Sequence, residues 1–186
     1  MRLPAHWQNV RLGDVLEKQP NGKVIQQGWS PQCLAVPAEP GEWGVLKTTA
    51  IQAGRFVPEE NKALPEHLDP RPTIEVEGGD LLITCAGPRS RCGVPALVRT
   101  ARSRLMMSGK MYRLRPGPGV LESYLELWLL SPEAQSRIDA MKTGISDSGL
   151  NLTHSRFVQL PVPVTDLDEQ RRIVEIIEDH FSRLDA

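Results

Sequence analysis

The chain has 186 residues, 40% of them hydrophobic, which is enough for one domain with an appended helix. The formal net charge of −1 argues against a uniformly basic nucleic-acid-binding surface, and the apolar runs are too short for a secretory leader or a membrane span. The three cysteines have no histidines near them that would complete a zinc site, so buried thiols in a cytoplasmic protein are expected.

The N-terminal segment is expected to pack on the core and to lead into loops. Its apolar residues are Trp7, Val10, Leu12, Val15 and Leu16. Residues 19–44 are rich in proline, glycine and glutamine, which predicts loops between short strands. Trp29 and Trp43 in this stretch are interpreted as anchors that fix the loops on the core, and contact with a nucleic-acid base is the alternative.

Residues 43–65 alternate between apolar and polar positions around Gly54. Lys47, Thr48 and Thr49 present an amine and two hydroxyls together, and such groups suit contacts with phosphates and base edges of DNA. The alternative is a surface strand in which threonine follows its β propensity. The sequence leaves both interpretations of these three residues open.

Residues 74–86 predict a strand that alternates at first and then becomes fully apolar, with a turn at residues 78–80. The loop GPRSRCG follows and carries Arg89, Ser90 and Arg91. A loop at the end of a core strand can aim such side chains, and arginine can donate two hydrogen bonds to guanine or grip phosphate. These residues are the first candidates for DNA readout, and returning strands are predicted at residues 94–99 and 106–115.

The stretch of residues 81–121 contains no aspartate or glutamate, although the chain has 23 acidic residues. The basic residues in this stretch are Arg89, Arg91, Arg99, Arg102, Arg104, Lys110, Arg113 and Arg115. This segregation predicts a cationic face that binds a polyanion, with Lys110 among its contacts. The alternative is that some of these arginines cover acidic helices elsewhere in the chain.

From residue 121 the apolar spacing becomes helical. Residues 121–129 predict one helix, and Ser131 followed by Pro132 predicts the start of a second helix, which Gly144 is expected to close. Short strands with a few helices and no regular βαβ alternation predict an α+β fold. The polar loop after the helices, with Ser146 and Asn151, is expected to face DNA.

The C-terminal region predicts a strand followed by an amphipathic helix. Pro161 and Pro163 favour an extended strand at a sheet edge within residues 158–164. Thr165 or Asp166 is the expected N-cap of the helix. The apolar stripe of the helix is Ile173, Ile177, Phe181 and Leu184. This stripe is interpreted as an interface with another helix, and packing on its own domain is the alternative.

No catalytic site and no metal site is predicted. The four histidines lack metal-ligand spacing, and the chain shows neither a phosphate-binding glycine loop nor the tetrapeptide of amino-methyltransferases. No clustered acidic pair followed by a lysine indicates a nuclease. The alternatives are a stand-alone DNA-binding protein, or a nuclease or methyltransferase with unrecognised motifs.

Several motifs resemble the specificity subunits of type I restriction-modification systems. The run LNLTHSRFVQLPVPVTDLDEQRRIVEIIEDHFSRLD is similar to the junction between a target recognition domain and a conserved helix in that family. The matching positions are Pro161, Pro163, Leu167, Glu169, Gln170, Ile173 and Val174, with Asp166 where the family usually has a proline. The segments LPAHWQNVRLGDVL and GDLLITCAG also resemble the family, as do Lys47, Ile51, Gly54 and Phe56.

This resemblance implies a DNA-recognition subunit with no catalytic residues and no cofactor of its own. It implies a target recognition domain at residues 1–160, and a linker strand with the start of a conserved spacer helix at residues 161–186. The implied partners are double-stranded DNA, the methylation and restriction subunits, and a second specificity half or second copy contacted through the C-terminal helix. The methylation subunit would hold S-adenosylmethionine, and no membrane is implied.

Overall fold

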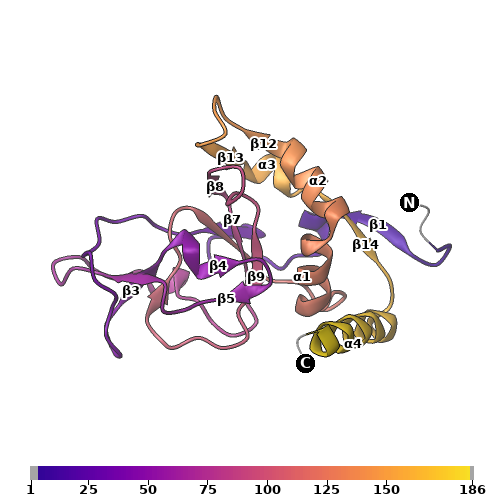
Figure 1. Ribbon diagram of the computed structural model, residues 1–186, viewed down its shortest axis with the longest axis horizontal. Helices are drawn as coiled ribbons and strands as arrows, with labels where there is room; N and C mark the ends of the chain where they lie inside the picture. The colour runs from indigo at the N-terminus through magenta and orange to yellow at the C-terminus, as the bar shows by residue number, and fades with distance from the viewer. Residues whose placement is uncertain (1–3, 185–186) are drawn as a thin grey trace.

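The computed structural model describes residues 4–184, apart from the side chain of Leu184, and it confirms the predicted α+β fold (Figure 1). The α-helices are α1 (Glu122–Leu130), α2 (Pro132–Met141), α3 (His154–Phe157) and α4 (Leu167–Leu184). The 3₁₀ helices are η1 (Leu12–Asp14), η2 (Thr48–Ala50) and η3 (Pro72–Ile74). The strands are β1 (Gln8–Arg11), β2 (Ile25–Gln27), β3 (Gly44–Leu46), β4 (Ile51–Gln52), β5 (Arg55–Phe56), β6 (Asn61–Ala63), β7 (Leu81–Thr84), β8 (Ala86–Gly87), β9 (Pro95–Leu97), β10 (Leu105–Met106), β11 (Met111–Leu114), β12 (Lys142–Thr143), β13 (Leu150–Leu152) and β14 (Pro161–Val164).

The central sheet has the strand order β2-β11-β7-β9 and is antiparallel throughout. All four residues of β7 are buried. Because successive side chains point to opposite faces of a strand, Leu81 and Ile83 pack in one core cluster while Leu82 packs in another. The strand predicted at residues 74–86 is shorter in the structure and spans only Leu81–Thr84, because η3 and a turn at Gly79 precede it.

Two hydrophobic clusters lie on the two sides of this sheet. The first core cluster contains Leu81, Ile83, Leu114, Leu125, Phe157 and their buried neighbours. The second core cluster contains Leu82, Val45, Ile51, Val98, Met111 and their buried neighbours. The strands β10, β3 and β6 form a separate sheet beside the second cluster, and the hairpin β4-β5 turns at Gly54, whose φ of 69° favours glycine.

The strand predicted from the two prolines is confirmed over residues 161–164, and it pairs with β1 from Gln8↔Val164 to Arg11↔Pro161. Residues 158–160 are not extended as predicted, because a turn at residues 158–159 follows directly on α3. The strands β1 and β14 thus form one two-stranded sheet. In the N-terminal segment, Trp7, Val10 and Val15 pack against the first core cluster, as expected.

The two helices predicted after residue 121 are confirmed as α1 and α2. Ser131 is the N-cap of α2, and its hydroxyl accepts a hydrogen bond from the backbone N–H of Ala134 at 3.2 Å. The prediction that Gly144 closes α2 is wrong. The helix ends at Met141, because Lys142 is extended and pairs with β13.

The helix α4 is capped by Asp166, whose Oδ1 accepts from the backbone N–H of Glu169 at 2.9 Å. Gln170 is fully buried and fastens the helix to the domain. Its Oε1 accepts from the N–H of Leu121 at 3.0 Å, and its Nε2 donates to the carbonyl of Gly119 at 3.0 Å. The first half of α4 is therefore attached to the residues that lead into α1.

Cys85 and Cys92 are buried free thiols, as predicted, whereas Cys33 is half-buried. Burial raises the pKa of Cys85 to about 12, so this thiol stays protonated at neutral pH. Its position in the first core cluster is in keeping with a packing role.

Arg113 lies inside the protein, with an exposed fraction of 1%. Its guanidinium donates to Gln19 at 2.7 Å, to Gln26 at 3.1 Å and to two backbone carbonyls, and it lies 3.6 Å from Asp80. Burial lowers the pKa of Arg113, and the nearby carboxylate of Asp80 opposes this shift. A charge buried in this way is tolerated because four hydrogen-bond acceptors and the carboxylate of Asp80 surround the guanidinium.

Replacing Arg113 by alanine is expected to lower the free energy of unfolding by about 3–5 kcal/mol, because Asp80, Gln19 and Gln26 would lose their buried partner. The measurement is denaturant unfolding of both proteins. Arg137→Ala is the matched control, since Arg137 forms an exposed pair with Glu133 on one helix and its loss should cost about 0.5 kcal/mol or less. Equal losses of stability for the two variants would contradict a supporting role for Arg113.

Candidate nucleic-acid interface

A groove of about 320 Å³ lies where η2, β6 and the turn before β11 come together. We call it the lysine groove, and its lining residues are Ser30, Pro31, Cys33, Val45, Leu46, Lys47, Thr48, Thr49, Lys62, Ser108 and Lys110. Its charged lining side chains are all lysines. The sequence prediction named Lys47, Thr48, Thr49 and Lys110, and the structure brings these four residues together.

The backbone around the groove is held by hydrogen bonds between distant segments. The backbone N–H of Lys47 donates to the backbone carbonyl of Glu60 at 2.9 Å, and the backbone N–H of Gly109 donates to the hydroxyl of Ser30 at 3.0 Å. Lys47 also pairs with the carboxylate of Glu60 at 2.6 Å, and the hydroxyl of Thr49 donates to the same carboxylate. These contacts lower the pKa of Glu60, with Lys47 as the first cause. Among the described residues, Lys47 is the groove lysine that forms an ion pair, so Lys62 and Lys110 offer the less compensated charges.

Lys62 was not predicted as a site residue. It lies at the middle of β6 and reaches the groove because β6 pairs with β3, opposite Val45. In the sequence it is one lysine in an alternating polar and apolar segment. Lys62 could have been assigned to the groove only if the strand that pairs with this segment had been known.

Arg91 is half-buried and contacts backbone carbonyls of the protein. Its Nη2 donates to the carbonyl of Ile51 at 2.8 Å and also to the carbonyl of Thr48. These bonds fasten the loop after β8 to η2 and β4. Arg91 therefore positions Thr48 and Thr49, and its role in direct base readout stays a prediction.

Arg89 lies between two carboxylates. Its Nη1 donates to both oxygens of Asp139 at 2.8 Å, and its Nε and Nη2 donate to Asp147 at 3.1 Å and 3.0 Å. The two aspartates raise the pKa of Arg89, with Asp147 as the first cause. The pKa of Asp139 is lowered by Lys142 first and by Arg89 second. Arg89 therefore neutralises acidic side chains, and its role as a reader of guanine stays a prediction.

The other predicted residues lie close to these two arginines. Ser90 is exposed between them, Ser146 is exposed with its hydroxyl 2.9 Å from that of Ser148, and Asn151 is exposed on β13 opposite Ala86. The three segments 47–51, 88–92 and 144–149 are called the loop ridge, and residues 47–49 of the first segment also line the lysine groove. Arg91 joins its first two segments and Arg89 joins its last two. In Figure 1 the labels β4, β8 and β13 follow one another from the centre of the molecule to its upper edge.

The interpretation of residues 81–121 as one cationic face is wrong in that form. Arg113 is buried, Arg99 pairs with Glu126 at 3.2 Å, and Arg115 pairs with Asp80 at 2.7 Å. The alternative, in which arginines cover acidic helices, accounts for Arg99, whose partner Glu126 lies on α1. Arg113 and Arg115 lie instead against Asp80, just before β7. Arg102 and Arg104 donate to backbone carbonyls of residues 38–42, whereas Lys110 lines the lysine groove.

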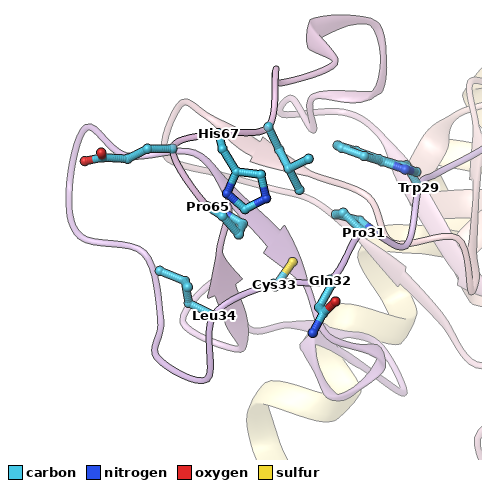
Figure 2. Close-up of a pocket in the computed structure, with 9 residues that line it drawn as sticks. Trp29, Pro31, Gln32, Cys33, Leu34, Pro65 and His67 are labelled. Carbon is cyan, nitrogen blue, oxygen red and sulfur yellow. The ribbon is translucent and has the colours of Figure 1, made fainter.

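A second hollow of about 850 Å³ adjoins the lysine groove (Figure 2). It is lined by Trp29, Pro31, Gln32, Cys33, Leu34, Pro65, Glu66, His67 and Leu68, and it shares Pro31 and Cys33 with the groove. Figure 2 shows the ring of His67 and the sulfur of Cys33 on either side of this space. The guanidinium of Arg71 lies over the ring of Trp29, 4.0 Å from its centroid. The backbone N–H of Trp29 donates to the carbonyl of Met107 at 3.0 Å. Trp29 is thus fixed at the edge of the hollow, consistent with the predicted anchoring role.

The family model described as "Type I restriction modification DNA specificity domain" matches residues 4–186. The chain belongs to this family. It is 36% identical to the type I restriction enzyme EcoEI specificity subunit of Escherichia coli, over 98% of this chain and 30% of that protein.

Solved structures of proteins with type I restriction-modification titles have a similar fold. One comes from a study of complex assembly and conformational transition in a type I restriction-modification system. It matches with a TM-score of 0.67 at 21% identity, and the match covers 40% of its length. The HsdS subunit of Thermoanaerobacter tengcongensis matches with a TM-score of 0.63 at 21% identity, and the match covers 39% of its length. These matches span 98% of this chain. The chain therefore corresponds to less than half the length of the relatives that it matches.

Within residues 4–184, no group of three or more histidine, cysteine, aspartate or glutamate side chains is arranged to hold a metal ion. Over the same residues, no helix combines the length and the apolar character needed to cross a bilayer.

Replacing Lys62 or Lys110 by alanine in this specificity domain should weaken binding to all DNA sequences about equally. Each substitution should also lower the slope of log affinity against log salt by about 1, because one phosphate contact and its released counterions are lost. The measurement is DNA affinity at several salt concentrations. Arg172→Ala on the exposed surface of α4 is the control, and it should leave the slope unchanged. Unchanged slopes for both lysine variants would place the phosphates elsewhere.

Arg89→Ala is expected to weaken DNA binding by about 1 kcal/mol, the order of one surface charge repulsion, because Asp147 would face the polyanion without compensation. The double variant Arg89→Ala with Asp147→Asn should recover most of this loss. If Arg89 instead reads a guanine, the double variant stays about 1–3 kcal/mol weaker and loses discrimination at one base pair. Binding to matched and mismatched duplexes separates these outcomes.

Proposed function

We propose that this chain recognises double-stranded DNA as one target recognition domain of a type I restriction-modification specificity subunit. The observation that carries the proposal is the family match over residues 4–186. The lysine groove supports it, since exposed ammonium and hydroxyl groups from separate segments converge there and suit phosphates and base edges. The loop ridge beside the groove supplies the side chains for sequence readout.

Cleavage and methylation belong, in this proposal, to separate restriction and methylation subunits. The chain contributes recognition, and its own residues take no catalytic role and hold no cofactor. S-adenosylmethionine is assigned to the methylation subunit. The EcoEI relative, itself named as a specificity subunit of a restriction enzyme, supports this division of labour.

The proposed target recognition domain comprises residues 1–160, and residues 161–186 form the linker strand and the start of a spacer helix. The pairing of β14 with β1 supports a rigid connection between these parts, and so does the attachment of α4 through Gln170. The direction of α4 relative to the loop ridge is thereby fixed by the domain itself. A specificity subunit needs such a fixed direction if two domains are to lie at a set spacing on DNA.

The C-terminal half of α4 is the proposed contact with a second specificity half or a second copy of the chain. Ile173 packs against the first core cluster and Val174 belongs to it, whereas Ile176 and Phe181 are each 59% exposed. A hollow of about 450 Å³, lined in part by Leu127 and Phe181, separates this half of α4 from α1. The apolar stripe predicted from the sequence therefore has a part that packs on the domain and a part that is exposed. Ile173 serves the domain, while Phe181 and the half-buried Ile177 remain available to a partner helix; the side chain of Leu184 lies outside the described residues.

The proposed function is tested by comparing DNA methylation in cells with and without the gene, together with its methylation subunit. The expected result is one sequence motif whose methylation depends on this chain, and loss of that motif in the Lys62→Ala, Lys110→Ala double variant. The purified chain alone should transfer no methyl groups. Methyl transfer by the chain alone, or identical methylomes with and without it, would overturn the proposal.

Replacing Ile176 and Phe181 together by aspartate is expected to abolish self-association of the chain and to leave its folding intact, because both side chains are largely exposed. The measurement is molar mass in solution against protein concentration. The matched control carries aspartate at Arg172 and His180, two exposed polar positions of the same helix. If the wild-type chain stays monomeric, and the aspartate variant also still joins the methylation subunit, the second half of α4 is not an assembly surface.

A further inference from the structure

The hairpin formed by β12 and β13 is anchored firmly at its base. Lys142 pairs with Leu152 and Thr143 pairs with Asn151, and β13 also pairs with β8. Leu150 and Leu152 are buried in the first core cluster. Residues 144–149, between the two strands, are all exposed. A rigid base thus presents a short, exposed tip at one end of the loop ridge.

The tip carries one charged side chain, that of Asp147, and this charge is compensated. Arg89 donates to it through Nε and Nη2, and the backbone N–H of Arg89 donates to the carbonyl of Asp147 at 2.8 Å. Lys142, whose side chain is 5% exposed, lies 3.0 Å from Asp139, the second carboxylate in contact with Arg89. Two cations and two carboxylates therefore balance, and the tip can approach a polyanion without net repulsion.

The remaining polar side chains of the tip are engaged with each other. The hydroxyls of Ser146 and Ser148 lie 2.9 Å apart. Ile145 stands next to them with a relative exposure of 108%, the largest value among the exposed large hydrophobic residues in the described part of the chain. Single exposed apolar residues are common on protein surfaces, and Ile145 is distinguished from them by its position. It projects from the ridge that is proposed to face DNA.

An isoleucine side chain has no polar atom and can form no hydrogen bond to a phosphate or to a base edge. In the major groove of DNA, the apolar feature that distinguishes one base pair from the others is the C5 methyl group of thymine. We propose that Ile145 contacts a thymine methyl group and so determines specificity at one position of the recognised sequence. Arg89 acts as a positioning residue in this proposal, since it holds the tip and neutralises Asp147. The inference rests on the proposed function.

The experiment replaces each thymine of the recognised duplex in turn by deoxyuridine, which removes the methyl group and leaves the base pairing unchanged. The complex of the chain with its methylation subunit should lose affinity about fourfold at one thymine, the effect expected for one buried methyl group. Ile145→Ala should bind the unmodified duplex about fourfold more weakly and should be insensitive to deoxyuridine at that thymine. Ile145→Val should keep the sensitivity, since it retains most of the apolar surface.

Val36→Ala is the matched control, because Val36 is 57% exposed on a loop outside the ridge. It should keep the wild-type affinity and the wild-type response to deoxyuridine. The inference is overturned if Ile145→Ala responds to every substitution as the wild type does, or if the recognised half-site contains no thymine. A uniform loss of affinity in Ile145→Ala with unchanged deoxyuridine responses would also overturn it. Absence of any sequence-specific binding by the wild-type complex would instead contradict the proposed function itself.

Discussion

The burial of β7 between two core clusters determines where the exposed loops of the candidate interface lie. Thr84 ends this strand, and its hydroxyl accepts from the N–H of Val94 at 2.9 Å and donates to the carbonyl of Arg91. The loop between these residues therefore leaves and rejoins the core at one point. From that loop Arg91 reaches η2 and Arg89 reaches the β12–β13 hairpin. Three segments far apart in the sequence are aligned because one strand cannot shift without exposing apolar surface on both of its faces.

The two kinds of basic residue have separate tasks in this protein. Arginine presents several N–H donors in a rigid planar group, so one side chain can join several acceptors of the fold. Arg113 does so in the interior, and Arg89 and Arg91 do so between neighbouring loops. The lysines of the groove keep more of their charge for an external anion. A net charge of −1 is therefore compatible with DNA binding, because many acidic side chains are paired with arginines within the fold, as Asp139 and Asp147 are with Arg89.

Features set by local chemistry were predictable from the sequence. The cap at Ser131, the proline-containing strand at residues 161–164 and the helix after Asp166 all follow from neighbouring residues, and the structure confirms them. Features set by distant pairing were not predictable. Lys62 joins the groove through the pairing of β6 with β3, and the end of α2 is set by the pairing of Lys142 with β13. The partners of Arg113 lie as far away as Gln19, so no local pattern distinguishes this arginine from an exposed one.

We propose that DNA lies along the lysine groove and the loop ridge. Chemical acetylation of lysines in the wild-type complex, with and without the recognised duplex, tests it most directly when each modified site is quantified by mass spectrometry. The account predicts that bound DNA protects Lys62 and Lys110 and leaves Lys18 and Lys23, exposed lysines outside the groove, equally reactive. Protection of Lys18 and Lys23 with full reactivity of Lys62 and Lys110 would place the DNA on another surface and contradict the account.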